Sequence, residues 1–246
     1  VLAIFCLSTL FATSQDVSAM IEEGVKLHDE GKFDEAIRKY DEVIAIAPNR
    51  YLAYYEKIFS LLKAAKYADC IEMSKLTLKK FPDSTLNGAI YVTFGTAYDM
   101  LKMPEQAIKT YNEGIKKYPK EALLYFNKGI TYYGMGKYED AIEAAEKSLQ
   151  TNPFHASSHN MMSKLTEKNK VYSMLASLFL LGIEPTGQRA KAHLRIVEGI
   201  IGSNVEKKDE KNINITLMMP DEKKKNKEHY LHLLEMMMSL SVAANY

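Results

Sequence analysis

The chain has 246 residues, of which 47% are hydrophobic and 26% are charged, and these values are typical of an ordinary globular protein. Its 32 basic and 31 acidic residues give a formal net charge of +1, so no global electrostatic attraction to nucleic acid or to an anionic membrane is expected. Only 12 Gly and 7 Pro interrupt it, which leaves most of the chain free to form regular structure.

The N-terminal segment begins with the apolar run VLAIFCLSTLF, which is too short to span a bilayer comfortably as a helix. Ala12 and Ser14 have the spacing of the −3 and −1 residues of a signal-peptidase site, so residues 1–14 are predicted to be a signal peptide cleaved before Gln15. The alternatives are an uncleaved anchor and an apolar first helix of the fold. Because the chain starts without Met or a basic segment, we expect its native start to lie upstream.

Cysteine usage is consistent with such processing. Cleavage after residue 14 removes Cys6 and leaves Cys70 as the only thiol, so no intramolecular disulfide can form. A single thiol in an oxidising compartment is best protected by burial. We therefore predict that Cys70 is a small buried residue, in preference to a reactive or metal-binding one.

A similar stretch of sequence recurs between residues 17 and 153. Four prolines are separated by 34, 37 and 34 residues, and they are Pro48, Pro82, Pro119 and Pro153. A small residue lies twelve positions before each of them, at Ala36, Cys70, Ala107 and Ala141. Twenty-four positions before them lie Gly24, Ile58, Gly95 and Gly129. Self-similarity at a fixed period predicts a repeat architecture.

Each unit is predicted to contain two helices, as the fourth unit illustrates. Gly134 and Gly136 break its apolar periodicity, and helical spacing resumes from Tyr138. Asn152-Pro153 then ends the second helix. Small residues at equivalent positions of the two helices, Gly129 and Ala141, should let their backbones approach closely.

These residues resemble the tetratricopeptide-repeat pattern, which has a Gly in the first helix, Ala and then an aromatic in the second, and a terminal Pro. The third unit matches at Gly95, Ala107, Tyr111 and Pro119, and the first unit has Tyr40 at the same aromatic position. The second departs, with Ile58, Cys70 and Ser74, so its packing should be less regular. The resemblance implies an all-α fold, a right-handed superhelical solenoid of stacked antiparallel helix pairs. The expected repeats are 17–50, 51–84, 88–121, 122–155 and a degraded fifth at 156–187.

The end of the chain is expected to differ from the repeats. In the fifth repeat the second helix is apolar nearly all round and should be buried on several sides. A capping helix over 187–202, with Leu194, Val197, Ile200 and Ile201 as its apolar stripe, should close the stack. Residues 203–246 then read as a charged linker, a short strand-like INITL segment and an apolar C-terminal helix.

No sequence motif for catalysis is present: there is no Gly-rich phosphate loop, HExxH, Cys pair or Gly-x-Ser-x-Gly. His155 and His159 have the spacing of a two-His metal site but no evident acidic or Cys partner, so packing or surface roles are favoured for them. His229 and His232 receive the same interpretation. We predict no enzyme activity, no cofactor and no metal.

Binding is expected in the concave groove that the first helices of this family's repeats form. The register places Ile21 and Val25 there, together with a larger set consisting of Tyr55, Phe59, Val92, Thr96, Phe126, Ile130 and Tyr133. The Lys, Arg and Asn residues that family members use to clamp a C-terminal carboxylate are missing at these positions. An apolar groove suits an amphipathic helix or an extended apolar segment, although some of these side chains could instead belong to the core.

The sequence thus predicts a non-catalytic scaffold that binds a protein or peptide in its groove, exported to the periplasm or the cell envelope rather than released into the medium. The alternative is a structural or assembly factor of a cell-envelope complex. In that case the C-terminal helix, Tyr230 to Val242, would serve as a docking element or would mask the groove. No nucleic acid is expected as a partner, and the sequence leaves the oligomeric state open.

Overall fold

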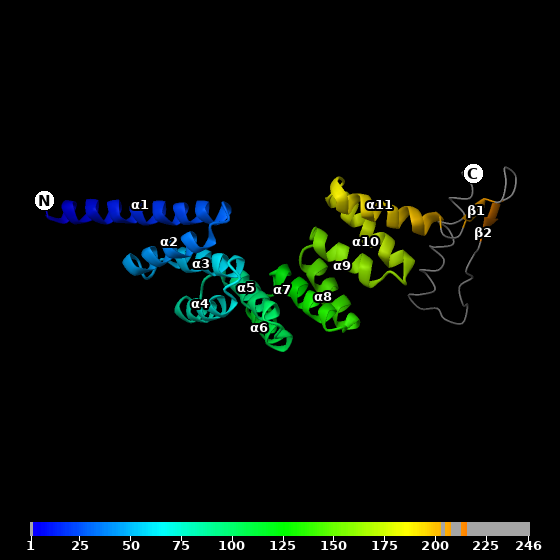
Figure 1. Ribbon diagram of the computed structural model, residues 1–246, viewed down its shortest axis with the longest axis horizontal. Helices are drawn as coiled ribbons and strands as arrows, with labels where there is room; N and C mark the ends of the chain where they lie inside the picture. The colour runs from blue at the N-terminus through cyan, green and yellow to red at the C-terminus, as the bar shows by residue number, and fades with distance from the viewer. Residues whose placement is uncertain (1, 203–204, 208–212, 216–246) are drawn as a thin grey trace. The chain divides into compact units, whose positions relative to one another are not determined.

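The computed structural model describes residues 2–202, 205–207 and 213–215, with side chains over residues 16–201. Within these ranges eleven helices follow one another along the chain, and two short strands follow the last (Figure 1). The helices are α1 (Leu2–Asp29), α2 (Phe33–Ile46), α3 (Tyr51–Lys63), α4 (Tyr67–Lys80), α5 (Asn87–Met100), α6 (Pro104–Lys117), α7 (Ala122–Gly134), α8 (Tyr138–Thr151), α9 (Ala156–Leu165), α10 (Lys170–Ile183) and α11 (Gly187–Gly202).

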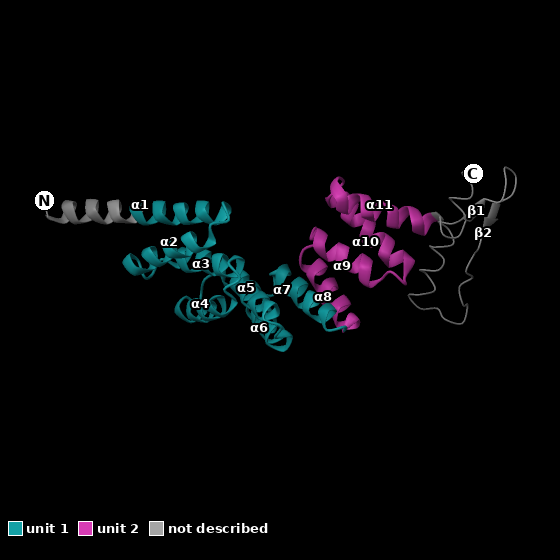
Figure 2. Cartoon of the chain, in the orientation of Figure 1, with its two compact units in different colours: residues 1–136 teal, residues 137–246 magenta. Residues whose placement is uncertain are grey.

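The helices divide into two compact units, Val1–Gly136 and Lys137–Tyr246 (Figure 2). The boundary lies in the turn between α7 and α8, within the repeat predicted over 122–155. In the first unit each helix from α1 to α7 packs against the next one, and α1, α3, α5 and α7 also pack side by side in that order. In the second unit α8 packs on α9, α9 on α10 and α10 on α11. The predicted fold class, stacked antiparallel helix pairs, is confirmed.

Local sequence accounts for the helix boundaries. Pro104 occupies the first turn of α6, where a missing backbone N–H costs nothing, and Glu105 and two C-terminal lysines complement the helix dipole. The N-cap of α10 is Asn169, whose side-chain oxygen accepts a hydrogen bond from Tyr172 N at 3.3 Å.

Four of the tight turns between paired helices share one backbone feature. A residue with positive φ lies in each, namely Gly31 (77°), Ala65 (58°), Lys102 (61°) and Gly136 (73°). Their spacing repeats that of the terminal prolines, so the left-handed residue is part of the repeat. Gly adopts this conformation freely, whereas Ala65 and Lys102 adopt it with some strain.

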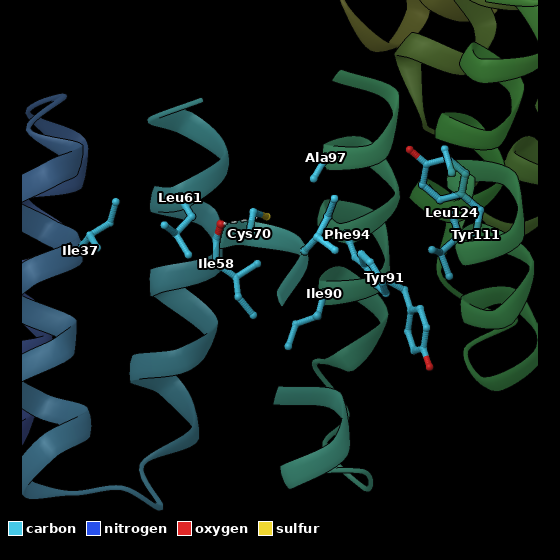
Figure 3. Close-up of a cluster of buried hydrophobic side chains, with 12 residues drawn as sticks. Ile37, Ile58, Leu61, Cys70, Ile90, Tyr91, Phe94, Ala97, Tyr111 and Leu124 are labelled. Atoms are coloured by element: carbon cyan, nitrogen blue, oxygen red, sulfur yellow. Dashed lines mark hydrogen bonds between the residues drawn. The ribbon is translucent and has the colours of Figure 1, made fainter. Parts of the chain in front are cut away.

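The largest core cluster of the first unit runs through α2 to α7 (Figure 3). Ile58, Ile90 and Leu124 are fully buried in it. Cys70 is also fully buried, and its thiol donates to the carbonyl oxygen of Ile58 at 3.6 Å. Burial raises the pKa of the Cys70 thiol to about 12, which keeps it protonated and unreactive. The prediction of a small buried Cys70 is therefore confirmed.

In the second unit one expectation holds only in part and another needs correction. Helix α10 packs against both α9 and α11, as expected of a helix buried on several sides, but Leu175, Leu178 and Phe179 remain exposed. In α11, Leu194 is 48% exposed and does not belong to a buried stripe, although Val197 is buried. His193 is buried instead, between α11 and its neighbours, a position that the apolar pattern did not indicate.

After α11 the strands β1 (Val205–Lys207) and β2 (Ile213–Ile215) pair antiparallel, with Val205 opposite Ile215. β2 lies within the predicted strand-like segment. β1 lies where a linker was expected, because pairing with β2 gives its backbone groups partners that local composition does not reveal. The predicted C-terminal helix, including His229 and His232, lies outside the described residues. Among the described helices none is long and apolar enough to cross a membrane.

Candidate functional site

The candidate binding surface is the side of α3, α5 and α7 on which the predicted groove residues recur at helical spacing. On α3, Tyr55 and Phe59 lie on a different side of the helix from Ile58 and Leu61, which are buried in the core. The corresponding positions are Val92 and Thr96 on α5 and Phe126, Ile130 and Tyr133 on α7. Because α3, α5 and α7 lie side by side, these residues form one surface, called here the inner face.

Large apolar side chains of the inner face are accessible. Tyr133 is 51% and Ile130 44% exposed, and Phe59 and Phe126 are half-buried. Leu52 and Leu123, which extend the same helical rows, are 36% and 40% exposed. Such exposed apolar residues on one surface are typical of binding sites for proteins.

An aromatic ladder runs along α3 at this face. The ring centroids of Tyr51 and Tyr55 are 6.0 Å apart, and those of Tyr55 and Phe59 are 4.8 Å apart. Tyr55 also packs against the core cluster, and burial raises the pKa of its phenol. The ladder therefore has a fixed base and a partly accessible surface, which suits an anchor for an apolar ligand because little side-chain entropy remains to be lost.

Some predicted groove residues belong to the core instead. Ile21 is only 3% exposed and packs with Val17 and Tyr40, so its assignment to the groove is wrong. Val25 packs half-buried against the same cluster. Val92 likewise packs against the main core cluster. The accessible part of the inner face is thus contributed by α3 and α7 more than by α5, and α1 does not extend it.

A polar cluster that sequence reasoning missed joins α5 to α6 and α7. Tyr111 Oη donates to Asp99 Oδ2 at 2.9 Å, and Thr131 Oγ1 donates to the same oxygen at 2.7 Å. Thr96 donates to the backbone oxygen of Val92 at 2.8 Å. Burial raises the pKa of the Asp99 carboxyl, although both hydroxyl donors oppose this shift.

The first two repeats carry a related polar pair at equivalent positions. His28 lies four residues after Gly24, as Asp99 does after Gly95, and its Nδ1 is 2.7 Å from Ser60 Oγ. Burial lowers the pKa of His28. The sequence does contain a polar residue four positions after each of these repeat glycines. Because one is a histidine and the other an aspartate, the sequence alone does not distinguish a buried polar position from an ordinary surface position.

At the signature positions of the repeats, a small residue on one helix faces a large side chain on its paired helix. A Cβ atom on Gly95 would lie 2.2 Å from Tyr111 Cε1, and one on Gly24 would lie 2.4 Å from Tyr40 Cε1. In the second repeat the first helix carries the bulky Ile58 and the second the small Ser74, and both are fully buried. The departure of this repeat from the family pattern is therefore a transfer of side-chain volume from the second helix to the first.

The remaining small signature residues are also buried. Fully buried small residues on the second helices are Ala36, Ala107 and Ala141, and Gly129 is buried on α7. The repeat-terminal residues Pro48, Pro82, Pro119 and Pro153 are exposed just beyond helix ends. Proline here prevents continuation of the helix.

Hydroxyl and imidazole groups meet in the second unit without forming an accessible site. Ser177 Oγ is 2.9 Å from His193 Nδ1, and His193 Nε2 is 3.0 Å from Asn160 Oδ1. Ser177 is 0% and His193 2% exposed, so no substrate can reach the hydroxyl in this structure, and the arrangement satisfies buried polar groups.

His155 and His159, for which packing or surface roles were favoured over metal binding, have packing partners. His155 Nδ1 is 2.7 Å from Ser158 Oγ, whereas His159 Nε2 is 2.8 Å from the Pro153 carbonyl oxygen. The His159 ring stacks on Phe179 with centroids 5.2 Å apart. Among the described residues, no three His, Cys, Asp or Glu side chains are grouped as metal ligands.

Comparison with known families identifies the repeats directly. Two tetratricopeptide-repeat models match, one over residues 122–155 and the other over residues 94–121. Residues 94–155 are therefore tetratricopeptide repeats. The matched segments contain Ala107, Tyr111 and Ala141, all three of which are fully buried.

Solved structures of tetratricopeptide-repeat proteins share this fold. TTC0263 of Thermus thermophilus is 16% identical, with 74% of this chain and 99% of that chain covered at a TM-score of 0.60. PilF of Pseudomonas aeruginosa is 18% identical, with 75% and 84% covered at a TM-score of 0.62. YrrB, described as having an unusual peptide-binding site, is 15% identical, with 77% and 97% covered at a TM-score of 0.50. At these identities the likeness establishes the fold alone.

Proposed function

We propose that this tetratricopeptide-repeat protein is a non-catalytic scaffold that binds an apolar helix or an extended apolar segment of another protein on its inner face. The fold supports a general role in protein–protein interaction, and the partial exposure of Phe59, Ile130 and Tyr133 on one surface carries the finer proposal. Aromatic side chains held in place by packing are favoured anchors at such interfaces.

The chemistry of the inner face favours an apolar ligand over an anionic one. Asp99 follows Val92 and Thr96 on α5, and burial raises the pKa of its carboxyl group. Glu56 follows Tyr55 on α3, and burial together with the nearby Asp29 raises the pKa of Glu56. A carboxylate ligand placed beside these groups would raise the electrostatic cost further, which agrees with the missing carboxylate-clamp residues.

The decisive experiment uses one variant of the inner face and one matched control. Ile130→Glu puts a charge on an accessible residue of α7, and Ile46→Glu does the same at a 62% exposed residue of α2. Affinity purification from native membranes and soluble extract, with crosslinking and mass spectrometry, should recover a partner with the native chain and with Ile46→Glu. Ile130→Glu should lose at least about tenfold of it, since burying one Ile side chain contributes about 1.5–3 kcal/mol. Equal recovery with both variants would overturn the inner face as the binding site.

We also propose that residues 1–14 act as an export signal, which would place the folded chain in the periplasm or at the cell envelope. The described core of the first repeat includes Val17 and Ile21, which follow the predicted cleavage point at Gln15. Cleavage there would leave these core contacts intact. Mass spectrometry of the protein recovered from fractionated cells should give a mature N-terminus at Gln15. Recovery of the intact segment in the cytoplasmic fraction would contradict the proposal.

A further inference from the structure

The outer side of α10 carries an apolar surface that its position in the repeat does not explain. Leu175, Leu178 and Phe179 lie at i, i+3 and i+4, so they share one side of the helix, and they are 38%, 44% and 59% exposed. Ser173 and Ser177, on the opposite side, are buried against Ser163 of α9. These three exposed residues are called here the α10 patch.

The other repeats show what normally occupies these positions. Ser173 lies twelve residues before Pro185, as Ala36, Cys70, Ala107 and Ala141 lie before their prolines, so the register is common to all five second helices. At the three positions of the patch, eleven of the twelve residues in α2, α4, α6 and α8 are charged or carry an amide, and only Leu76 is apolar. The outer sides of α2, α4, α6 and α8 are therefore solvated polar surfaces. Among the five second helices, α10 alone has an apolar outer side.

The chain itself contains a segment suited to this patch. Residues Tyr230 to Val242, YLHLLEMMMSLSV, have Leu or Met at most positions and need an apolar surface to leave water. The antiparallel pairing of β1 with β2 returns residue 215 to the level of residue 205, close to α11, with which β1 is in contact. Fourteen residues then separate Ile215 from Tyr230. A random coil of fourteen residues has a root-mean-square span of about 20 Å, and a tether of that reach holds its end at an effective concentration in the millimolar range.

The direction of the helices brings the two ends together. α10 and α11 are packed neighbours joined by a short connection, residues 184–186, so α11 returns along α10 and ends near the beginning of α10. Leu175 lies in the first half of α10, the half beside which α11 ends. A second chain at micromolar concentration would compete poorly with a segment held at millimolar concentration.

We propose that the chain's own C-terminal segment, Tyr230 to Val242, docks on the α10 patch. The segment thereby covers apolar surface of the second unit, and the proposed partner site on the first unit is a separate surface. The occupant is therefore intramolecular, and the patch completes the fold of this chain instead of recruiting another protein.

The test is site-specific photocrosslinking of the full chain with benzoylphenylalanine at position 178. A control carries the same probe at Glu146, the corresponding position of α8. Equal amounts of ¹⁴N- and ¹⁵N-labelled chains are mixed before irradiation, so that crosslinks within one chain are distinguished from crosslinks between two. The expected result is a crosslink from 178, but not from 146, to residues 230–242 within one isotope. Mixed-isotope crosslinks would show that a second copy occupies the patch, and absence of crosslinks to that segment would show that the patch is not its site; either result overturns the proposal.

Limited proteolysis of chains without the photocrosslinking residue gives a second readout. Chymotrypsin should cleave the 230–242 segment slowly in the native chain and about tenfold faster in Leu178→Glu, because one Leu contact is lost from the docked state. Leu76→Glu, which changes the one apolar residue at a patch position of another second helix, is the matched control and should leave the rate unchanged. Circular dichroism confirms that both variants are folded. Equal cleavage of all three chains would overturn the proposal.

Discussion

Substitution of Gly95 by Ala tests the volume exchange between paired helices. The new Cβ would lie 2.2, 2.6 and 2.7 Å from three ring atoms of Tyr111, and this ring is fully buried. The ring is held by the bond from its hydroxyl to Asp99 at 2.9 Å, so it cannot move aside without weakening that contact. Replacing a helical Gly by Ala normally stabilises by about 1 kcal/mol. Overpacking costs about 1–3 kcal/mol, and a hydrogen bond to a charged group contributes about 1.5–3 kcal/mol.

The balance of these effects is a net loss of about 1.5–5 kcal/mol in the free energy of unfolding. The assay is urea denaturation followed by circular dichroism at the helical band, with hydrogen exchange of the α5 and α6 amides as the local readout. Gly199→Ala is the control, because a Cβ there meets no atom within 4 Å and should stabilise by about 0.5–1 kcal/mol. If Gly95→Ala were as stable as the native chain, the claim that the Tyr111 ring requires glycine would be refuted.

The double variant Gly95→Ile/Tyr111→Ser copies the division of volume found at Ile58 and Ser74. Each single change should destabilise, one by overpacking and the other by leaving a cavity. The double variant should lose less than the sum of the singles by at least about 1 kcal/mol. Strict additivity would mean that these two positions do not share one packing volume.

Three further predictions concern the thiol, the turns and the titration of a buried imidazole. In a Cys6→Ser chain, Cys70 should react with a disulfide reagent only on denaturation, since burial raises its pKa to about 12; rapid reaction of the folded chain would contradict its burial. Ala65→Gly should stabilise by about 1 kcal/mol because the residue has φ of 58°, whereas Ala64→Gly, at φ of −72°, should not, and equal effects in thermal melts would exclude backbone strain as the cause. Burial and the nearby Lys164 and Arg189 lower the pKa of His193, so the unfolded chain binds the proton more tightly and stability should fall as pH drops below about 6.5. His193→Asn should reduce that slope in melts between pH 7 and pH 5, and an unchanged slope would assign it to other groups.

The repeats could be predicted from the sequence because each one has the same residue types at the same spacing. Proline ends, small residues at Ala36 or Ala107, and the Gly24 and Gly95 positions each report a steric requirement that one helix pair imposes on its own sequence. The second-repeat residues Ile58 and Ser74 broke the pattern in type but conserved the summed volume. Compared position by position, Ile58 and Ser74 depart from the family pattern. In the folded helix pair, the larger residue on the first helix compensates for the smaller residue on the second.

Side-chain accessibility could be decided only by the tertiary structure. Helical register placed Ile21 and Phe59 on equivalent sides of α1 and α3, yet Ile21 is buried in the core and Phe59 remains half-exposed. The apolar composition of α10 predicted burial on several sides, and only the packing of α9 and α11 decides that Phe179 remains exposed. Sequence periodicity determines which residues share a side of a helix, because that follows from 3.6 residues per turn. Which side meets a neighbour depends on contacts between helices distant along the chain, and no local pattern encodes them.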